Sequence, residues 1–342
     1  MKALTLTDVE KFEIIEKDIP KVKKGQVLIE VSKCGICGSD IHMIWHTGYN
    51  AGKNAVIGHE FCGTVVDAGD STILKNGDRV AAIEMDSCLN CDYCNHDKPE
   101  LCDHVLENGP GIGTDGGYGQ YVLMRDDMAI KLPDEISDIS AALVEPFSVS
   151  YHGAKQAKIS GGKTVLITGC GPIGLFAAAA SYALEASKIV ILEANPERIK
   201  LAEESHFVTY ALNSLDTDIN KKLTEIEPDG FDAVIECSGN KNASTLALNN
   251  LKKGGHMSII AYGDAPEIDI FNLVNKERHI DGSLFFTVNE FKEAIELMAS
   301  KKINLEKYVK LIKMEEVQET LEKMKRHEEN QIKYMIDYKA MK

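Results

Sequence analysis

The sequence predicts an α/β protein in which a β-rich domain is combined with a doubly wound parallel sheet. The chain has 342 residues, so two domains of roughly 150 to 200 residues are expected. The N-terminal half contains short Val- and Ile-bearing segments broken by glycines, which is typical of strands. From Gly162 onward, apolar strands alternate with helical patterns, which indicates parallel β-α-β units.

The elements follow this division along the chain. The β-rich part is expected to contain strands at residues 26–31, 62–68 and 78–83. The doubly wound sheet is expected to contain strands at residues 164–168, 188–193, 232–237 and 256–261, with helices beginning near Pro172, Pro196 and Asn242. Helical patterns at residues 289–300 and 314–327 form a tail that we expect to return to the first domain.

Charge and composition exclude some classes of function. The formal net charge is -15, from 38 Lys and Arg against 53 Asp and Glu, so neither nucleic acid nor an anionic membrane is an expected partner. The longest apolar stretch, residues 172–184, is too short to span a bilayer, and the first twenty residues lack the pattern of an export signal. Four of the nine cysteines lie within fifteen residues, which indicates metal binding in a reducing cytoplasm.

A glycine-rich turn predicts a dinucleotide site. The motif G-x-G-x-x-G follows an expected strand and opens an apolar helix; its residues are Gly169, Gly171, Pro172, Ile173 and Gly174, with Cys170 between the first two glycines. Glycines let the backbone approach a pyrophosphate, and the free N–H groups at the helix start face the phosphates. Pro172 suits the first turn of a helix because it has no N–H to leave unpaired.

The residues after the next strand favour NAD over NADP. Glu193 ends that strand, where a carboxylate accepts hydrogen bonds from the adenosine ribose and repels a 2′-phosphate. Arg198, in the helix that begins near Pro196, is a further candidate for binding the cofactor. The alternative is that the motif is only a turn and Glu193 a solvated acid.

Four closely spaced cysteines predict a structural metal site. Cys88, Cys91, Cys94 and Cys102 have the spacing C-x2-C-x2-C-x7-C in a polar segment. Four thiolates suit tetrahedral Zn²⁺ and leave no open coordination position, so the ion orders a lobe that has little apolar surface to bury. An iron–sulfur cluster and unligated core thiols are the alternatives.

A second candidate metal site is scattered along the chain. Its members are Cys37 in a G-I-C-G-S-D segment, the pair His59 and Glu60 after Gly58, and Glu145 before Pro146. Taken alone, His59 reads as a core histidine and Cys37 as a buried thiol. Their occurrence together with the dinucleotide motif and the four cysteines indicates a catalytic metal centre.

These motifs, in this order, resemble the zinc-containing medium-chain dehydrogenases over nearly the whole chain. The matching pieces are the G-I-C-G-S-D segment with His42, the G-H-E segment, the four-cysteine lobe, Gly116-Gly117-Tyr118, Glu145-Pro146 and the nucleotide turn. The resemblance implies a GroES-like catalytic domain at residues 1–150 and 286–342, with a structural zinc lobe at 86–104, and a Rossmann NAD-binding domain at 151–285. It also implies a homodimer or homotetramer.

The resemblance assigns roles to the scattered residues. Cys37 and His59 correspond to ligands of the catalytic zinc, and Glu60 to a ligand or a close outer carboxylate. Glu145 stands where the archetypal alcohol dehydrogenases have a third cysteine, which looks like the sorbitol, butanediol and related polyol branch. Either Glu60 or Glu145 can be the direct ligand, and the two can exchange during turnover.

Three further residues take roles from the same resemblance. Asp40 corresponds to a carboxylate that fixes the His59 imidazole. Ser39 and His42 match a relay that carries the substrate's proton to solvent. The simpler interpretations are a turn hydroxyl for Ser39 and a surface imidazole for His42.

The family implies two zinc ions per chain and NAD-linked oxidation of a secondary alcohol to a ketone. The expected substrate is a polyol, sugar, cyclitol, diol or sugar-alcohol phosphate. The alternatives are a threonine 3-dehydrogenase-like activity and a non-catalytic NAD-binding protein. Sorbitol dehydrogenases carry an Arg-Tyr pair where this chain has residues 282–286, which include no cation, so sorbitol itself is not expected. Aromatic residues that could line a substrate pocket or pack in the core are Trp45, Tyr49, Tyr118 and Phe147.

Overall fold

The computed structural model describes residues 1–8, 11–45 and 55–339, and these fold into two compact units. Unit 1 consists of Met1–Glu145 and Thr287–Lys342, and unit 2 of Pro146–Phe286. The described chain is mixed α/β with a mainly antiparallel and a parallel sheet, so the predicted fold class is confirmed. Among the described helices, none has the length and apolarity that crossing a bilayer requires.

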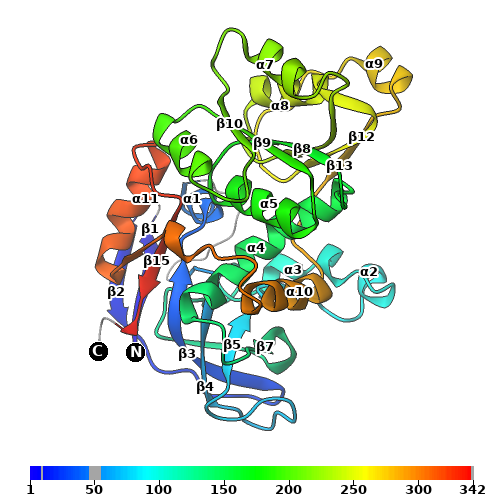
Figure 1. Cartoon of the computed structure of the whole chain (residues 1–342). Helices are drawn as coiled ribbons and strands as arrows, with labels where there is room; N and C mark the ends of the chain where they lie inside the picture. The colour runs from blue at the N-terminus through cyan, green and yellow to red at the C-terminus, as the bar shows by residue number, and fades with distance from the viewer. Residues whose placement is uncertain (9–10, 46–54, 340–342) are drawn as a thin grey trace. The chain divides into compact units, whose positions relative to one another are not determined.

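Unit 1 is built on a seven-stranded sheet of order β14-β15-β3-β4-β5-β7, with β6 also paired to β3. β15 runs antiparallel to β3 with Met335 opposite Gly35, so the C-terminal tail completes the sheet of the N-terminal residues (Figure 1). A separate hairpin joins β1 and β2. The strands of unit 1 are β1 (Lys2–Asp8), β2 (Lys11–Glu16), β3 (Gln26–Gly35), β4 (Phe61–Asp67), β5 (Arg79–Ala82), β6 (Tyr121–Arg125), β7 (Ala129–Lys131), β14 (Val309–Ile312) and β15 (Lys333–Asp337).

The helices around this sheet are short except for two. α10 (Val288–Ala299) starts with a capping box in which Thr287 and Glu290 satisfy each other's backbone N–H groups. α4 (Asp138–Gln156) begins in unit 1 and ends in unit 2, and it contains Glu145 and Pro146 in one helix that was not predicted. The remaining helices are α1 (Gly38–Trp45), α2 (Asp92–Asn95), α3 (Val105–Asn108) and α11 (Val317–Lys325), with 3-10 turns at Pro99–Leu101, Asp126–Met128, Glu306–Tyr308 and Met314–Glu316.

Unit 2 is a six-stranded parallel sheet of order β10-β9-β8-β11-β12-β13. In order of the chain this is 3-2-1-4-5-6, the doubly wound arrangement that binds dinucleotides at the carboxyl ends of its strands. The strands are β8 (Thr164–Thr168), β9 (Lys188–Glu193), β10 (Tyr210–Asn213), β11 (Phe231–Glu236), β12 (Leu251–Ile259) and β13 (His279–Gly282). The helices are α5 (Pro172–Ala183), α6 (Pro196–Glu203), α7 (Ile219–Ile226), α8 (Lys241–Asn249) and α9 (Ile270–Asn275).

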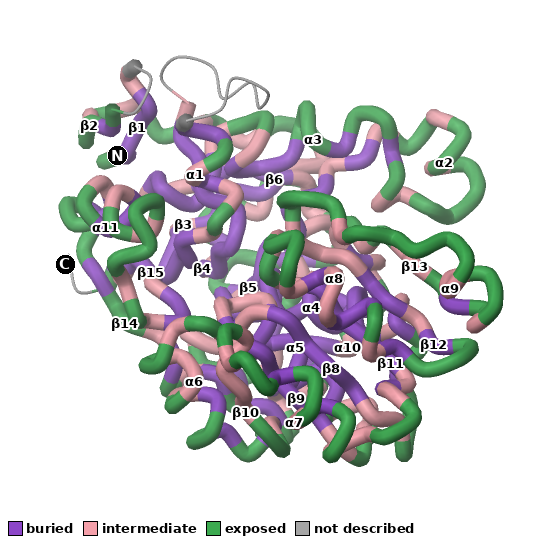
Figure 2. Tube along the Cα trace, turned by 90° about the horizontal axis from the view of Figure 1, so that it is seen from above, coloured by how far each residue is buried: buried purple, intermediate pink, exposed green. Residues whose placement is uncertain are grey.

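The expected strands at 164–168 and 188–193 are confirmed as β8 and β9, whose central residues are fully buried (Figure 2). β12 begins at Leu251, earlier than expected, because Leu251 pairs with Phe231 ahead of a register shift. The edge strands β10 and β13 were missed because they are short and mostly half-exposed or exposed, so they carry little apolar alternation.

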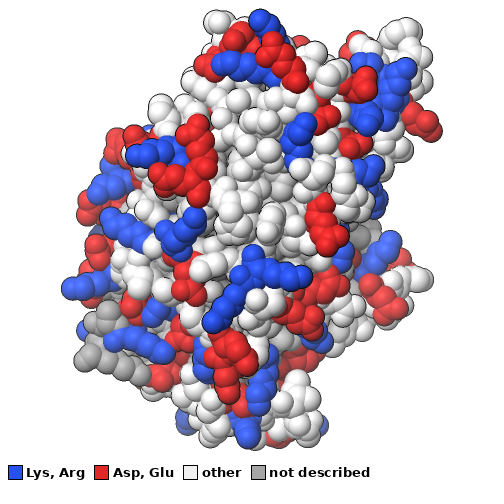
Figure 3. All heavy atoms as spheres, in the orientation of Figure 1, with Lys and Arg blue, Asp and Glu red and all other residues white. Residues whose placement is uncertain are grey.

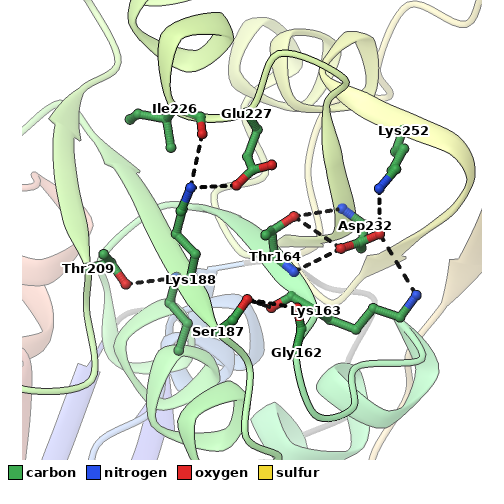
Figure 4. A network of polar contacts seen from close by, with 11 residues as sticks. Gly162, Lys163, Thr164, Ser187, Lys188, Thr209, Ile226, Glu227, Asp232 and Lys252 are labelled. Atoms are coloured by element: carbon green, nitrogen blue, oxygen red, sulfur yellow. Dashed lines mark hydrogen bonds and ion pairs between the residues drawn. The ribbon is translucent and has the colours of Figure 1, made fainter.

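Hydrogen bonds and ion pairs connect residues at the amino ends of strands in unit 2. Asp232 accepts hydrogen bonds from the backbone N–H and hydroxyl of Thr164 at 3.0 and 3.2 Å, and pairs with Lys163 and Lys252 (Figure 4). Lys188 binds Glu227 and the Ile226 carbonyl nearby. The opposite, carboxyl ends of β8 and β9 carry the glycine-rich turn.

Charged side chains are distributed over the surface without a one-signed field on the face in view. Lys and Arg alternate with Asp and Glu there, although the chain as a whole has a net charge of -15 (Figure 3). On this face, the described residues form no extended cationic track for a polyanion.

Candidate functional site

The four cysteines of the predicted lobe converge on one point. The sulfur atoms of Cys88, Cys91, Cys94 and Cys102 all lie within 4.8 Å of one another. Cys94 Sγ is 3.5 Å from Cys91 Sγ and 4.0 Å from Cys88 Sγ. A tetrahedral zinc ion with Zn–S bonds of about 2.3 Å separates its sulfurs by about 3.8 Å. The spacing therefore fits one ion held by four thiolates.

Backbone N–H groups donate to the sulfur atoms of this cluster, although burial raises the pKa of the Cys102 thiol to about 11. The N–H groups of Cys91 and Cys88 donate to Cys88 Sγ and Cys102 Sγ, both at 3.3 Å, and His104 N–H donates to Cys102 Sγ at 3.4 Å. A hydrogen bond from the Cys94 backbone is the main cause that lowers the pKa of the Cys91 thiol to about 6. The helices of the lobe bury almost nothing, with Val105 as their one buried side chain. A bound ion is thus the natural source of its order.

The second cluster joins two segments that are adjacent through the sheet. Cys37 lies between β3 and α1, and His59 and Glu60 lie just before β4. The backbone N–H of Gly35 donates to the Glu60 carbonyl at 2.8 Å, which aligns these segments. One ligand atom from each of Cys37, His59 and Glu60 lies within 4.8 Å of the others. A thiol, an imidazole and a carboxylate form a mixed donor set that suits a catalytic zinc ion with an open position.

The His59 ring is oriented by Asp40. Asp40 is fully buried and its Oδ2 accepts hydrogen bonds from the Cys37 N–H at 2.9 Å and from the Tyr118 hydroxyl at 2.8 Å. Its Oδ1 faces His59 Nδ1 at 3.6 Å, and neither of these two buried atoms has a hydrogen-bond partner. Burial lowers the pKa of His59, but Cys37, Asp40 and Glu145 outweigh this and raise it well above its usual value. A cation coordinated by the ring would replace the proton that this environment favours.

Glu145 lies beside the cluster but outside the group of three. It is 5% exposed, and burial together with the charge of Glu84 raises its pKa well above its usual value. The charges of Cys37, His59 and Glu60 also act on it. The structure thus places both predicted carboxylates near Cys37 and His59, with Glu60 inside ligand distance.

Glu60 is held by a lysine that the sequence analysis missed. Lys333, on β15, is 2% exposed; it forms an ion pair with Glu60 and donates to the Ile36 carbonyl at 2.9 Å. Burial disfavours the ammonium charge, but Glu60 outweighs it and raises the pKa of Lys333. One sequence signal was available. Lys333 lies in the otherwise largely apolar strand Lys333–Asp337, and a buried lysine needs an anionic partner.

Ser39 and His42 lie on α1 next to the cluster. Ser39 Oγ is 3.4 Å from His59 Nε2, and His42 follows three residues later, on the same face of the helix, with an exposed side chain. The pair therefore leads from the buried cluster toward solvent. Of the aromatic candidates, Tyr118 and Phe147 are fully buried core residues, whereas Tyr49 and the side chain of Trp45 lie outside the described residues.

The glycine-rich turn in unit 2 has the shape a dinucleotide requires. Gly169 adopts a φ of +83°, and a Cβ on Gly174 would lie 1.9 Å from the Gly169 carbonyl oxygen, so neither position accepts a side chain. A Cβ on Gly171 would meet nothing within 4 Å. Pro172 and Ile173 then begin α5. The backbone at Gly171 is thus open to an approaching pyrophosphate.

Glu193 sits at the end of β9 against this turn. Its Oε2 accepts the Cys170 N–H at 2.6 Å, and its Oε1 accepts the N–H groups of Ala194 and Asn195 at 2.7 and 2.9 Å. Arg198, on α6, is close enough to lower the pKa of Cys170, although burial raises that pKa overall to about 12. The Glu193 carboxylate is therefore fixed by backbone N–H groups at the carboxyl end of β9, beside the turn.

The chain matches known protein families and relatives over most of its length. Residues 23–134 match the alcohol dehydrogenase GroES-like domain, and residues 172–300 match the zinc-binding dehydrogenase domain. The chain is 31% identical over 345 residues to a sorbitol dehydrogenase of Bacillus subtilis, covering 98% of this chain and 97% of that protein. It is 34% identical over 294 residues to an L-threonine 3-dehydrogenase of Chelativorans sp., covering 82% and 83%.

A solved structure shows the same architecture. A putative zinc-binding dehydrogenase from Sinorhizobium meliloti, bound to NADP, superposes with a TM-score of 0.90 at 26% identity and covers 98% of both chains. The resemblance inferred from the motifs is confirmed over nearly the whole sequence. The chain belongs to the zinc-binding dehydrogenases with an alcohol dehydrogenase GroES-like domain.

Proposed function

We propose that this chain oxidises a secondary alcohol of a polyol, sugar, cyclitol, diol or sugar-alcohol phosphate to a ketone, reversibly and with NAD⁺. This proposal rests on the set of half-buried Cys37 with buried His59 and Glu60, beside which a second carboxylate, Glu145, lies in place of a third thiol. The sorbitol dehydrogenase relative, matched over 98% of this chain, supports polyol-type chemistry.

Cys37 and His59, with Glu60 or Glu145, would hold the catalytic zinc, and Cys88, Cys91, Cys94 and Cys102 the structural zinc. When bound, the catalytic ion would lower the pKa of the substrate hydroxyl, and NAD⁺ would accept a hydride from the carbon that carries this hydroxyl. Ser39 receives the hydroxyl proton and passes it toward His42, which is exposed and releases it to solvent. Because Asp40 faces His59 Nδ1, Nε2 is the ring nitrogen that would bind the ion.

We assign the cofactor site to the Rossmann domain at residues 151–285. Gly169, Gly171, Pro172, Ile173 and Gly174 receive the pyrophosphate, and Arg198 stands near the turn. The fixed carboxylate of Glu193 supports NAD over NADP, since a 2′-phosphate would lie against a negative charge. The catalytic domain would comprise residues 1–150 and 286–342, with the zinc lobe at 86–104.

Two features bear on the substrate. The segment 282–286 offers no cation to bind hydroxyl groups, which argues against sorbitol itself. The threonine 3-dehydrogenase relative favours oxidation of a β-hydroxy amino acid as the second candidate. A non-catalytic NAD-binding protein is the third candidate. One experiment separates the three candidates.

That experiment is an alcohol panel scored by NADH absorbance. Polyols, cyclitols, diols, sugar-alcohol phosphates and L-threonine are offered with NAD⁺ to the zinc-loaded protein. The proposal expects turnover with a polyhydroxy secondary alcohol. Turnover with L-threonine alone would establish the second candidate, and tight NAD⁺ binding without turnover on any alcohol would favour the non-catalytic reading.

We further propose a homodimer or homotetramer in the cytoplasm. The last strand of the unit 2 sheet, β13, lies at its edge, and the preceding helix α9 exposes Ile270, Phe271 and Val274 by 63 to 74%. A second copy of the chain would cover this apolar surface. All nine cysteines are free thiols, which suits a reducing compartment. Light scattering of the purified protein gives the subunit number, and a monomer at micromolar concentration would refute the assembly.

A further inference from the structure

Two glutamates end the strands on either side of β8. In the sheet of unit 2, β8 lies between β9, which ends at Glu193, and β11, which ends at Glu236. Glu236 lies opposite Thr168, the last residue of β8, in the parallel register. The chain order of the strands reverses direction between β8 and β11, and a doubly wound sheet binds its dinucleotide at the carboxyl ends of the strands at this point. Glu236 therefore ends its strand beside the predicted cofactor site.

Glu236 is buried, and one of its oxygens accepts four hydrogen bonds. The residue is 2% exposed. Its Oε1 accepts the hydroxyl of Thr168 at 3.1 Å and the hydroxyl of Ser238 at 2.5 Å. The same oxygen accepts the backbone N–H groups of Ser238 and Gly239 at 2.9 and 3.0 Å. Glu236 thus connects the loop at residues 237–239 to the end of β8.

This loop is packed between two glycine-bearing turns. A Cβ on Gly169 would lie 3.2 Å from the Cys237 carbonyl oxygen, and a Cβ on Gly263 would lie 2.2 Å from the Gly239 carbonyl oxygen. The backbone N–H of Asp264 donates to the same Gly239 carbonyl at 3.0 Å. A shift of the loop would therefore disturb the glycine-rich turn on one side and the segment after β12 on the other.

Glu193 has the corresponding contacts on the other side of β8. It accepts the N–H groups of Ala194 and Asn195 from its own loop, and the N–H of Cys170 just beyond the end of β8. A doubly wound sheet consists of two mononucleotide-binding halves, and the acid after the second strand belongs to the half that binds adenosine. Glu236 has the same kind of contacts in the other half, which takes the nicotinamide nucleotide.

We propose that Glu236 is a positioning residue that fixes the loop at residues 237–239 for the nicotinamide nucleotide of NAD⁺. This role rests on the proposed function, in which unit 2 binds NAD⁺. Glu236 acts through the backbone of the loop and need not touch the cofactor. Without it, the N–H groups of Ser238 and Gly239 lose their acceptor, and the loop has to be ordered at the moment of binding, which weakens affinity.

The test compares Glu236→Leu, which removes the acceptor, with Glu236→Gln, which keeps one side-chain oxygen. Calorimetry measures the Kd of NAD⁺ and the Kd of ADP, which lacks the nicotinamide nucleoside, and the emission of bound NADH reports the surroundings of the nicotinamide ring. The matched control is Glu227→Gln, because Glu227 pairs with Lys188 at the opposite, amino ends of the same sheet. Thr168→Val removes only the hydroxyl bonded to Glu236, and it replaces Glu236→Leu if the latter does not fold, with Thr168→Ser as its conservative partner.

Glu236→Leu is expected to raise the Kd of NAD⁺ by about tenfold or more and the Kd of ADP by less than about twofold. The emission of bound NADH should move toward that of NADH in water. Thr168→Val should change the two constants in the same direction by a smaller factor. Glu236→Gln, Thr168→Ser and the control should stay within about threefold of the wild type for both ligands.

Two results in the variants would overturn the proposal. One is wild-type affinity for NAD⁺ in Glu236→Leu, and the other is equal weakening of NAD⁺ and ADP, which would indicate a general loss of structure in unit 2. A wild type that binds NAD⁺ and ADP but oxidises no alcohol refutes the proposed enzymatic function and leaves the Glu236 result valid. A wild type that binds neither ligand refutes the cofactor site and the role of Glu236 with it.

Discussion

The two clusters of candidate metal ligands in unit 1 differ in how far apart their residues lie in the sequence and in how deeply they are buried. The cluster of Cys88, Cys91, Cys94 and Cys102 is contained in fifteen consecutive residues of a lobe with almost no buried side chain. The cluster of Cys37, His59 and Glu60 draws on separate segments, is mostly buried, and is surrounded by further charged groups. The first offers a metal four thiolates and would leave it no open position, whereas the second offers three mixed donors and would leave one open.

The difference lies also in what holds the ligands. The thiols of the lobe are held by backbone N–H groups within the lobe itself. Two members of the buried cluster lie against charged side chains: Asp40 faces His59, and Lys333 forms an ion pair with Glu60. A change at the lobe should therefore act first on stability, and a change at the buried cluster first on turnover.

The largest expected effect is on turnover when the buried cluster loses its thiol. Cys37→Ser should lower kcat with the best alcohol by more than about 100-fold, since losing a direct ligand costs more than losing an outer partner. The rate of NADH formation measures this. The melting temperature should stay close to that of the wild type. A large drop would contradict the expectation that this cluster acts mainly on turnover and the lobe mainly on stability.

The matched change in the lobe is Cys91→Ser. It should lower the free energy of unfolding by about 3 to 5 kcal/mol, because the lobe has no apolar core to replace the ion. Denaturant unfolding at fixed zinc concentration measures this loss. Unchanged stability together with lost turnover would show that the lobe cluster is the reactive one.

A smaller effect is expected when the partner of His59 is weakened. Asp40→Asn keeps the shape and removes the charge that faces His59 Nδ1 at 3.6 Å. Zinc affinity at this site and kcat should each fall by about 10- to 100-fold. Chelator competition and steady-state kinetics check both, while the zinc of the lobe should be retained. Wild-type zinc affinity in Asp40→Asn would contradict a role for Asp40 in metal binding.

The smallest effect falls in unit 2, away from both metals. Glu193→Gln should improve the use of NADP⁺ relative to NAD⁺ by about tenfold, or about 1.4 kcal/mol, because the carboxylate no longer repels a 2′-phosphate. The ratio of kcat/KM for the two cofactors measures the change. An unchanged ratio would contradict the role assigned to Glu193.

The difference between contiguous motifs and residues scattered along the chain explains what the sequence could predict. The lobe and the glycine-rich turn are contiguous motifs, so spacing alone located Cys88 to Cys102 and Gly169 to Gly174. The strands β8 and β9 were predicted because they are central in the sheet and nearly uniformly apolar. Cys37 and His59 could be joined only through the resemblance, since a backbone hydrogen bond at the sheet, not proximity in sequence, brings them together.

The residues that were missed depend on long-range partners. Lys333 is 273 positions from Glu60 in the chain, and no local pattern marks the two as an ion pair. Burial of a charged side chain is a three-dimensional property, and the sequence shows only that such a residue lies next to apolar ones.

The most direct test of the division between the clusters is the zinc content of three proteins: the wild type, Cys37→Ser and Cys91→Ser. Elemental analysis after gel filtration should give about two zinc ions per chain for the wild type and about one for each variant. The remaining ion of Cys37→Ser should resist chelators, as expected of a closed thiolate site, and that of Cys91→Ser should exchange readily. One zinc in the wild type, lost completely in either variant, would contradict the account.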